Sequence, residues 1–180
     1  ALLLAAAALG AAAQPTPPEV AARQHLLIDL GSGRVLAEHE ADAALDPAGA
    51  TPLMTAHLVL DALQAGRLAP EAELPVSPRA RAERRPGVPL MYVDGRVRAD
   101  ALLQGLAVLG AHDAAVALAE GVAGSVDEFV AQMNRRAPAL GLGATVFRNP
   151  TGAPARGQTS TPRDIARLAE RLLASHAGIV

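Results

Sequence analysis

The feature that most restricts the fold of this chain is a series of helix start and stop signals beginning near residue 50. Thr51 is a favourable N-cap, Pro52 suits the first helical position, and Gly66 is a helix stop. Pro138 should end or kink the helix that begins near residue 125. The same signals predict further helices that begin at Asp100, at Asp113 with a stop at Gly121, at Ser125 with Glu128, and at Thr161-Pro162-Asp164. A mainly helical region is therefore expected after residue 50.

Extended segments precede and interrupt the helices. Residues 25–30 and 34–39 are short extended runs joined by Gly31-Ser32-Gly33, which predicts a β-hairpin. Residues 67–95 are rich in proline and are expected to be irregular. Residues 145–148 form a further short extended piece before an Asn149-Pro150-Thr151-Gly152 turn.

The composition excludes several classes of function. The chain has 180 residues, which suits one modest domain, and a formal net charge of -2. This charge, with only one Tyr and two Phe, disfavours nucleic-acid binding. The chain has no Cys, which excludes disulfides and thiolate chemistry, and no Lys, so every basic residue is Arg.

The chain begins with features of an exported protein. Residues 1–13 form an apolar run that is too short to span a bilayer, and small residues at Ala11 and Ala13 fit a signal-peptidase site. We interpret 1–13 as a signal-peptide remnant, 14–24 as a Pro-rich tether and 25–180 as one domain. This division predicts a secreted, periplasmic or cell-envelope protein without a transmembrane span in the mature chain. The alternative is that 1–13 forms a buried Ala/Leu helix.

Several short motifs follow one another between residues 25 and 173. They are Leu30-Gly31-Ser32-Gly33-Arg34-Val35-Leu36, Asp46-Pro47-Ala48, Leu53-Met54-Thr55, Leu90-Met91-Tyr92, residues 113–120, residues 129–134, Asn149-Pro150-Thr151-Gly152 and residues 160–164. In this order and spacing they resemble the secreted D-alanyl-D-alanine carboxypeptidases, serine enzymes of the penicillin-binding and β-lactamase-like group. The resemblance implies an α+β fold with an antiparallel sheet beside a mainly helical subdomain. It also implies action on peptidoglycan stem peptides. Because the family's late strands are absent from this sequence, we expect an incomplete sheet.

The resemblance also indicates where catalytic residues should stand. The family uses a Ser at the start of a helix with a Lys three residues later, a Ser-x-Asn element and a Lys-Thr-Gly element. Aligned on the motifs, Gly49 stands at the Ser position and Pro52 at the Lys position, while Gly110 and His112 stand at the Ser-x-Asn positions. The chain contains no Lys-Thr-Gly. No catalytic residue is therefore expected to be intact.

Other polar residues have ordinary structural explanations. Ser125 and Ser160 are predicted to be helix caps rather than nucleophiles. His57 and Asp61 have an i, i+4 spacing, which we interpret as a helix-surface contact, so no metal or other cofactor is predicted. Asp113 should cap its helix, and the resemblance implies that His112 lies at the mouth of a vestigial catalytic cleft. The arginines at 79, 81, 84 and 85 suggest a solvated loop, with anionic lipid or wall polymer as the alternative partner.

Three functional hypotheses follow. The first is a carboxypeptidase-like envelope protein without acyl-transfer chemistry that binds a peptidoglycan stem peptide or a cell-wall protein. The second is an incomplete or degenerate gene fragment without independent function. The third is a functional serine-type D-Ala-D-Ala carboxypeptidase, as family membership alone would suggest.

Overall fold

A computed structural model describes residues 20–83 and 95–176 of the chain. The signal-like run 1–13, most of the tether 14–24, the Leu90-Met91-Tyr92 motif, Arg84 and Arg85 lie outside the described residues.

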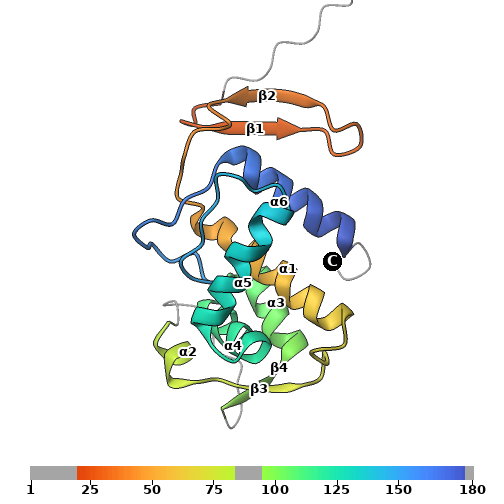
Figure 1. Cartoon of the computed structure of the whole chain (residues 1–180), viewed down its shortest axis with the longest axis vertical. Helices are drawn as coiled ribbons and strands as arrows, with labels where there is room; N and C mark the ends of the chain where they lie inside the picture. Colours follow the sequence, from red (N-terminus) through yellow and green to blue (C-terminus); the bar gives the residue numbers. More distant parts are fainter. Residues whose placement is uncertain (1–19, 84–94, 177–180) are drawn as a thin grey trace, which may run out of the picture.

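Helices make up the body of the molecule, and α4 lies in its lower part, beneath α5 (Figure 1). Every residue of α4 from Asp113 to Ala119 is buried, and this helix contacts α1, α2, α3 and α5. None of the helices in the described ranges is long and apolar enough to cross a membrane. The helices are α1 (Thr51–Gln64), α2 (Pro78–Ala82), α3 (Ala99–Leu109), α4 (His112–Ala123), α5 (Val126–Ala139) and α6 (Pro162–Ser175), with a 3-10 turn, η1 (Ala48–Ala50), before α1.

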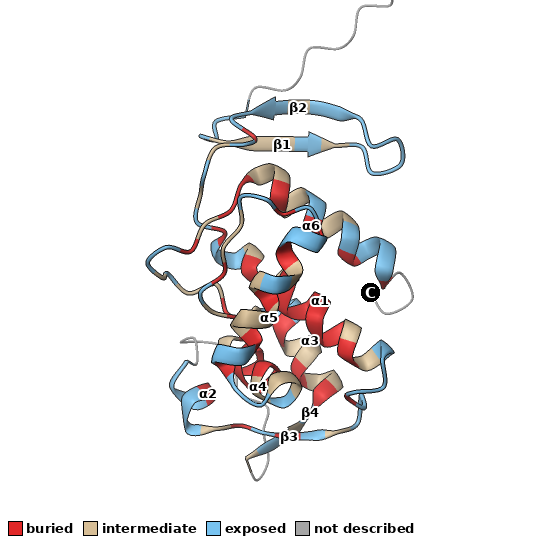
Figure 2. Cartoon of the chain, viewed as in Figure 1, coloured by how far each residue is buried: buried red, intermediate tan, exposed pale blue. Residues whose placement is uncertain are grey.

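The buried residues are concentrated in α1 and α4 (Figure 2). Alanine is frequent in α4, so neighbouring helices can approach it closely. Phe129, Phe147, Met54, Leu118 and Met133 are the largest apolar side chains that are fully buried. With 2% aromatic residues in the chain, the core is mainly aliphatic.

Two antiparallel strand pairs complete the α+β fold and lie at opposite ends of the molecule (Figure 1). The predicted hairpin is confirmed as β1 (His25–Ile28) paired with β2 (Val35–His39), with His25 opposite His39. β3 (Glu73–Pro75) pairs with β4 (Arg96–Arg98). In the described part of the chain each sheet has two strands, and Leu27, Leu30, Val35 and Leu36 of the hairpin region are exposed.

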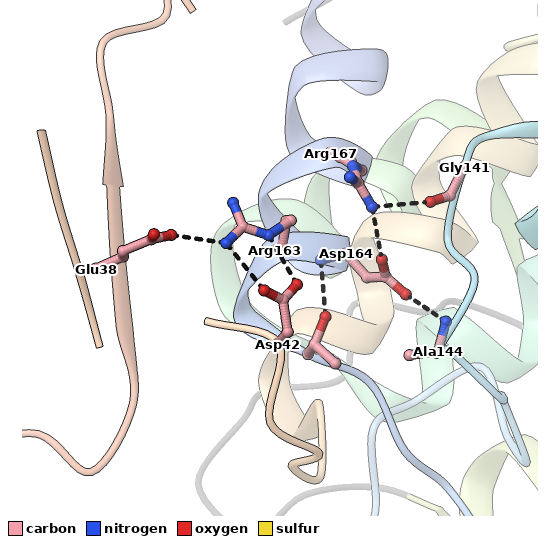
Figure 3. Close-up of polar contacts among 8 residues, drawn as sticks. Glu38, Asp42, Gly141, Ala144, Arg163, Asp164 and Arg167 are labelled. Atoms are coloured by element: carbon pink, nitrogen blue, oxygen red, sulfur yellow. Dashed lines mark hydrogen bonds and ion pairs between the residues drawn. The ribbon is translucent and has the colours of Figure 1, made fainter. Parts of the chain in front are cut away.

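The β1–β2 hairpin is joined to α6 through the guanidinium of Arg163 (Figure 3). Arg163 Nε donates to Asp42 Oδ1 at 2.7 Å, and Nη2 donates to Asp42 Oδ2 at 3.0 Å and to Glu38 Oε2 at 2.6 Å. The hydrogen bonds that Arg163 donates to these two carboxylates hold its pKa above its ordinary value. The neighbouring Asp164 accepts from the backbone N–H of Ala144 at 2.9 Å. These two adjacent residues therefore position both the hairpin and the segment after α5.

Several predicted helix boundaries need correction. Thr51 is the first residue of α1 rather than its cap, because the chain already turns in η1 and Ala50 occupies the N-cap. Asp100 and Asp113 lie in the first turns of α3 and α4, where their carboxylates accept from the next backbone N–H. Gly121 lies inside α4, which ends at Gly124 with φ 79°. A Cβ at Gly121 would lie 2.5 Å from Leu74 Cδ1, so the Leu74 side chain packs directly against this glycine.

The region 67–95, predicted to be irregular, contains β3 and the short helix α2. Both elements are too short to produce a periodic apolar pattern, and Ser77 caps α2 by accepting from the Ala80 N–H at 3.0 Å. Arg79 and Arg81 lie on this helix rather than in a loop.

The caps predicted for the two last helices are confirmed in part. Ser125 Oγ accepts from the Glu128 N–H at 3.2 Å, and Thr161 Oγ1 accepts from the Asp164 N–H at 3.1 Å. Pro138 lies in the last turn of α5, which ends one residue later. Ser160 is not a cap, since its hydroxyl bonds the Thr145 hydroxyl at 2.9 Å and its backbone pairs with Leu45.

Candidate functional site

The segment 46–52, which carries two of the positions singled out in the sequence, leads from a loop through η1 into α1. Asp46 Oδ1 accepts from the Ala48 N–H at 3.0 Å, and the Ala50 N–H donates to the Pro47 carbonyl at 2.8 Å. Ala48 has a positive φ of 41°, which few residues other than glycine adopt. The segment is therefore a tightly turned entrance to the helix.

The turn 149–152 packs against this entrance to α1. Asn149 Oδ1 accepts from the backbone N–H groups of Thr151 at 3.1 Å and Gly152 at 2.8 Å. Gly152 has φ 80°, and a Cβ placed on it would lie 2.0 Å from the Ala48 carbonyl oxygen. The turn backbone and the η1 backbone are thus in direct contact.

A buried hydrogen bond joins α1 to the same turn. Thr55 Oγ1 donates to the Pro150 carbonyl at 2.7 Å, and Thr55 is 0% exposed. Replacement Thr55→Val keeps the shape but leaves the carbonyl unpaired. We expect it to lower the free energy of unfolding by about 1–3 kcal/mol, measured by urea denaturation.

Thr51 supplies the matched control for this prediction. It lies on the same helix and is also 0% exposed, but its Oγ1 has no hydrogen-bond partner among the described residues. Thr51→Val should therefore leave stability unchanged or raise it. Equal losses in the two variants would contradict the role of the Thr55 hydrogen bond.

Gly49 and Pro52 offer no reactive group at the start of α1. Gly49 is exposed in η1, and no described atom lies within 4 Å of a Cβ built on it, so the backbone has room for a side chain that the sequence does not supply. Pro52 is the second residue of α1 and has neither an amine nor a backbone N–H. The helix start therefore has space for a nucleophile but contains none.

Gly110 and His112 lie at the junction of α3 and α4. Gly110 ends α3 with φ 58°, and Ala111, the N-cap of α4, is 6% exposed. His112 is the first residue of α4 and is half-buried. Both helices of the junction pack against α1. His112 is the one polar side chain at these three positions.

The serines outside these positions have structural roles. Ser77 Oγ accepts from the Ala80 N–H and donates to Glu120 Oε1 at 3.1 Å, while Ser32 lies in the hairpin turn. Ser125 caps α5, Ser160 pairs with Thr145, and the Ser175 carbonyl accepts from Gln64 Nε2 at 3.0 Å. The Thr51 Cβ lies beside Gly152 of the turn 149–152, but Thr51 is fully buried. None of these contacts indicates a replacement nucleophile.

A polar cluster made of His57, Asp61 and His176 lies where the end of α6 packs on α1, away from the positions described above. His57 Nε2 is 3.6 Å from Asp61 Oδ2, and His176 Nε2 is 3.5 Å from Asp61 Oδ1. The two imidazole rings meet edge to face with centroids 5.3 Å apart. The interpretation of His57 and Asp61 as a surface contact is wrong, because the His57 side chain is 0% exposed.

The charge state of His57 follows from its burial. Loss of solvent lowers the pKa of His57 below its ordinary value, and the nearby Arg136 and His176 lower it further, against the opposing effect of Asp61. The imidazole is therefore neutral at pH 7. Arg136 Nε donates to His57 Nε2 at 3.4 Å, and Arg136 Nη2 donates to Asp61 Oδ2 at 3.2 Å.

Sequence analysis missed His176 as a partner of His57. The two residues stand at opposite ends of the helical region, and nothing in their local sequence links them. One signal was present: His57 lies between apolar residues in the run Ala56-His57-Leu58-Val59-Leu60, which indicates a buried rather than an exposed helix position.

Comparison with known sequences gives a consistent result. A family model described as D-alanyl-D-alanine carboxypeptidase matches residues 11–178. The chain is 37% identical over 164 residues to the D-alanyl-D-alanine carboxypeptidase DacA of Escherichia coli, covering 88% of this chain and 41% of that protein. It is 35% identical over 153 residues to DacF of Bacillus subtilis, covering 84% of this chain and 39% of that protein. The chain spans about two fifths of the length of these curated relatives.

Solved structures agree on the fold. The D-alanyl-D-alanine carboxypeptidase DacD of Francisella tularensis superimposes with a TM-score of 0.85 at 29% identity, covering 92% of this chain and 40% of that chain. Penicillin binding protein 5 of Haemophilus influenzae gives a TM-score of 0.84 at 31% identity, covering 91% of this chain and 48% of that chain. The described helices and hairpin thus have the arrangement found in these two proteins.

Proposed function

The chain belongs to the family of D-alanyl-D-alanine carboxypeptidases, and from this we propose that the protein binds peptidoglycan stem peptides without cleaving them. The family relation supports a role in peptidoglycan metabolism and a place in the cell envelope. The proposed ligand is a stem peptide, with a cell-wall protein as a further partner of the same surface.

The observation that carries the proposal is the pair Gly49 and Pro52 at the start of α1. We propose that they occupy the positions of the family's nucleophilic Ser and its Lys base. Removing the nucleophile or the base of a serine hydrolase lowers turnover by about a million-fold. Gly49 cannot form an acyl-enzyme, and Pro52 cannot accept a proton. Because both the nucleophile and the base are missing, we propose a binding function rather than a catalytic one.

The α3–α4 junction supports the same conclusion. We propose that Gly110 and His112 stand where the family has Ser-x-Asn. Gly110 has no hydroxyl to relay a proton, although His112 keeps a polar group that could hydrogen-bond a bound peptide. We propose that backbone groups and His112 at this junction still hold a stem peptide.

The test measures binding and hydrolysis separately on the same protein. A synthetic pentapeptide ending in D-Ala-D-Ala should bind with measurable heat in calorimetry, and a peptide ending in L-Ala-L-Ala should not. Released D-Ala, measured with D-amino-acid oxidase, should stay at the level of a blank without protein. D-Ala release above the blank would overturn the inactive assignment, and absence of binding would overturn the proposed ligand.

A further inference from the structure

The cluster of His57, Asp61 and His176 has the donor set of a zinc site. The side chains supply two imidazole nitrogens and a carboxylate, which are common ligands of Zn²⁺. Asp61 lies about 15 Å along α1 from Thr51, so the cluster is separate from the helix start discussed above. The contact between α1 and α6 brings the three residues together.

The distances within the cluster suit a tetrahedral ion. Ligands bound at 2.0–2.2 Å to a tetrahedral Zn²⁺ lie about 3.3–3.6 Å from one another. His57 Nε2 lies 3.6 Å from Asp61 Oδ2 and His176 Nε2 lies 3.5 Å from the other carboxylate oxygen, Oδ1, so each histidine is at this spacing from one oxygen of Asp61. One candidate atom from each of the three residues lies within 4.8 Å of the others.

The hydrogen bonding of the histidines points to a missing ligand. The His176 side chain is 0% exposed, and within residues 20–83 and 95–176 neither of its ring nitrogens has a hydrogen-bond partner. Buried polar groups in proteins nearly always have a partner. The Asp61 side chain, which is 26% exposed, connects the cluster to solvent and gives an ion a route of entry.

From these observations we propose that His57, Asp61 and His176 bind one Zn²⁺ ion, with water as the fourth ligand. The ion would cross-link the C-terminal end of α6 to the middle of α1. Gln64 Nε2 already holds the Ser175 carbonyl at 3.0 Å, one residue before His176, so the cross-link extends an existing contact. Zinc would thereby stabilise the folded state.

Arg136 is the group that competes with the ion. Its guanidinium donates to the same His57 nitrogen and to an Asp61 oxygen. The Arg136 side chain is 42% exposed, so it can turn into solvent when an ion takes its place. Removing this positive charge should therefore strengthen metal binding.

The experiment is a titration of the full chain, stripped of metal with a chelator, with Zn²⁺ in calorimetry and with Co²⁺ followed by visible absorption. We expect one ion per chain and the absorption of four-coordinate cobalt. His176→Gln and Asp61→Asn should each weaken binding by at least about 100-fold. Arg136→Gln should tighten it by about tenfold or more. Zn²⁺ should raise the Tm of the unaltered protein but not that of His176→Gln.

His39→Gln is the matched control for this titration. His39 is exposed on β2 and forms a ring contact with His25, with centroids 6.0 Å apart, so this pair is the alternative place for an adventitious ion. Binding should be unchanged in His39→Gln. Circular dichroism of each metal-stripped variant establishes that it is folded, and the part-exposed Asp61 provides a ligand variant with little effect on packing. No binding by the unaltered protein, undiminished binding by folded Asp61→Asn, or loss of binding in His39→Gln would overturn the proposal.

Discussion

Purified protein incubated with a fluorescent penicillin is expected to carry no covalent label after denaturation. Penicillins acylate the serine nucleophile of carboxypeptidases, and the start of α1 has Gly49 and Pro52 where we propose that the nucleophile and base belong. The expected deficit is about a million-fold in the rate of acyl transfer, which places labelling below detection. Gel fluorescence after boiling in detergent is the measurement.

The control for labelling is an active D-alanyl-D-alanine carboxypeptidase treated in parallel at the same concentration. Any label on the protein would be located by mass spectrometry of its peptides. A stoichiometric label on one serine would refute the inactive assignment and identify the replacement nucleophile. Label spread over several residues would also appear in heat-denatured protein and reflects non-specific reaction.

The second large effect is expected from Gly152→Ala. The new methyl group would lie 2.0 Å from the Ala48 carbonyl oxygen and 3.3 Å from Thr51 Cβ, while φ 80° is unfavourable for alanine. The turn 149–152 and the start of α1 would both have to move. We expect a loss of about 2–5 kcal/mol in the free energy of unfolding, a large part of the stability of a typical domain.

Gly124→Ala separates the steric contact from the backbone strain. Gly124 has φ 79°, nearly the same φ as Gly152, but no described atom lies within 4 Å of a Cβ built there. Its replacement should cost about 1–2 kcal/mol, from the left-handed conformation alone. Urea denaturation of the two variants gives the comparison. If Gly152→Ala were no more destabilising than Gly124→Ala, the close contact between the turn and η1 would be disproved.

Helix caps formed by neighbouring residues could be predicted from the sequence. Ser125 with Glu128 and Thr161 with Asp164 are local hydrogen bonds between a side chain and a backbone N–H three residues later. The hairpin turn at residues 31–33 is local in the same sense. Each of these features is formed by residues that are close together in the sequence, so the sequence alone is enough to predict it.

Other boundaries depended on contacts between distant parts of the chain. Gly121 does not end α4, and the space where its Cβ would lie is occupied by Leu74 of β3. Ser160 is drawn into pairing with Leu45 and Thr145 instead of capping α6. No local pattern of residues contains this information.

The same distinction separates the positions aligned with the family's catalytic residues from the cluster of His57, Asp61 and His176. The identities of Gly49, Pro52, Gly110 and His112 are facts of the sequence, so the absence of hydroxyl and amine groups at these positions was decided without a structure. The contact of η1 with Gly152 and the burial of His57 beside His176 were decided by tertiary packing alone. Side-chain chemistry is a property of single residues, whereas burial and proximity depend on how α1, α6 and the turn 149–152 pack together.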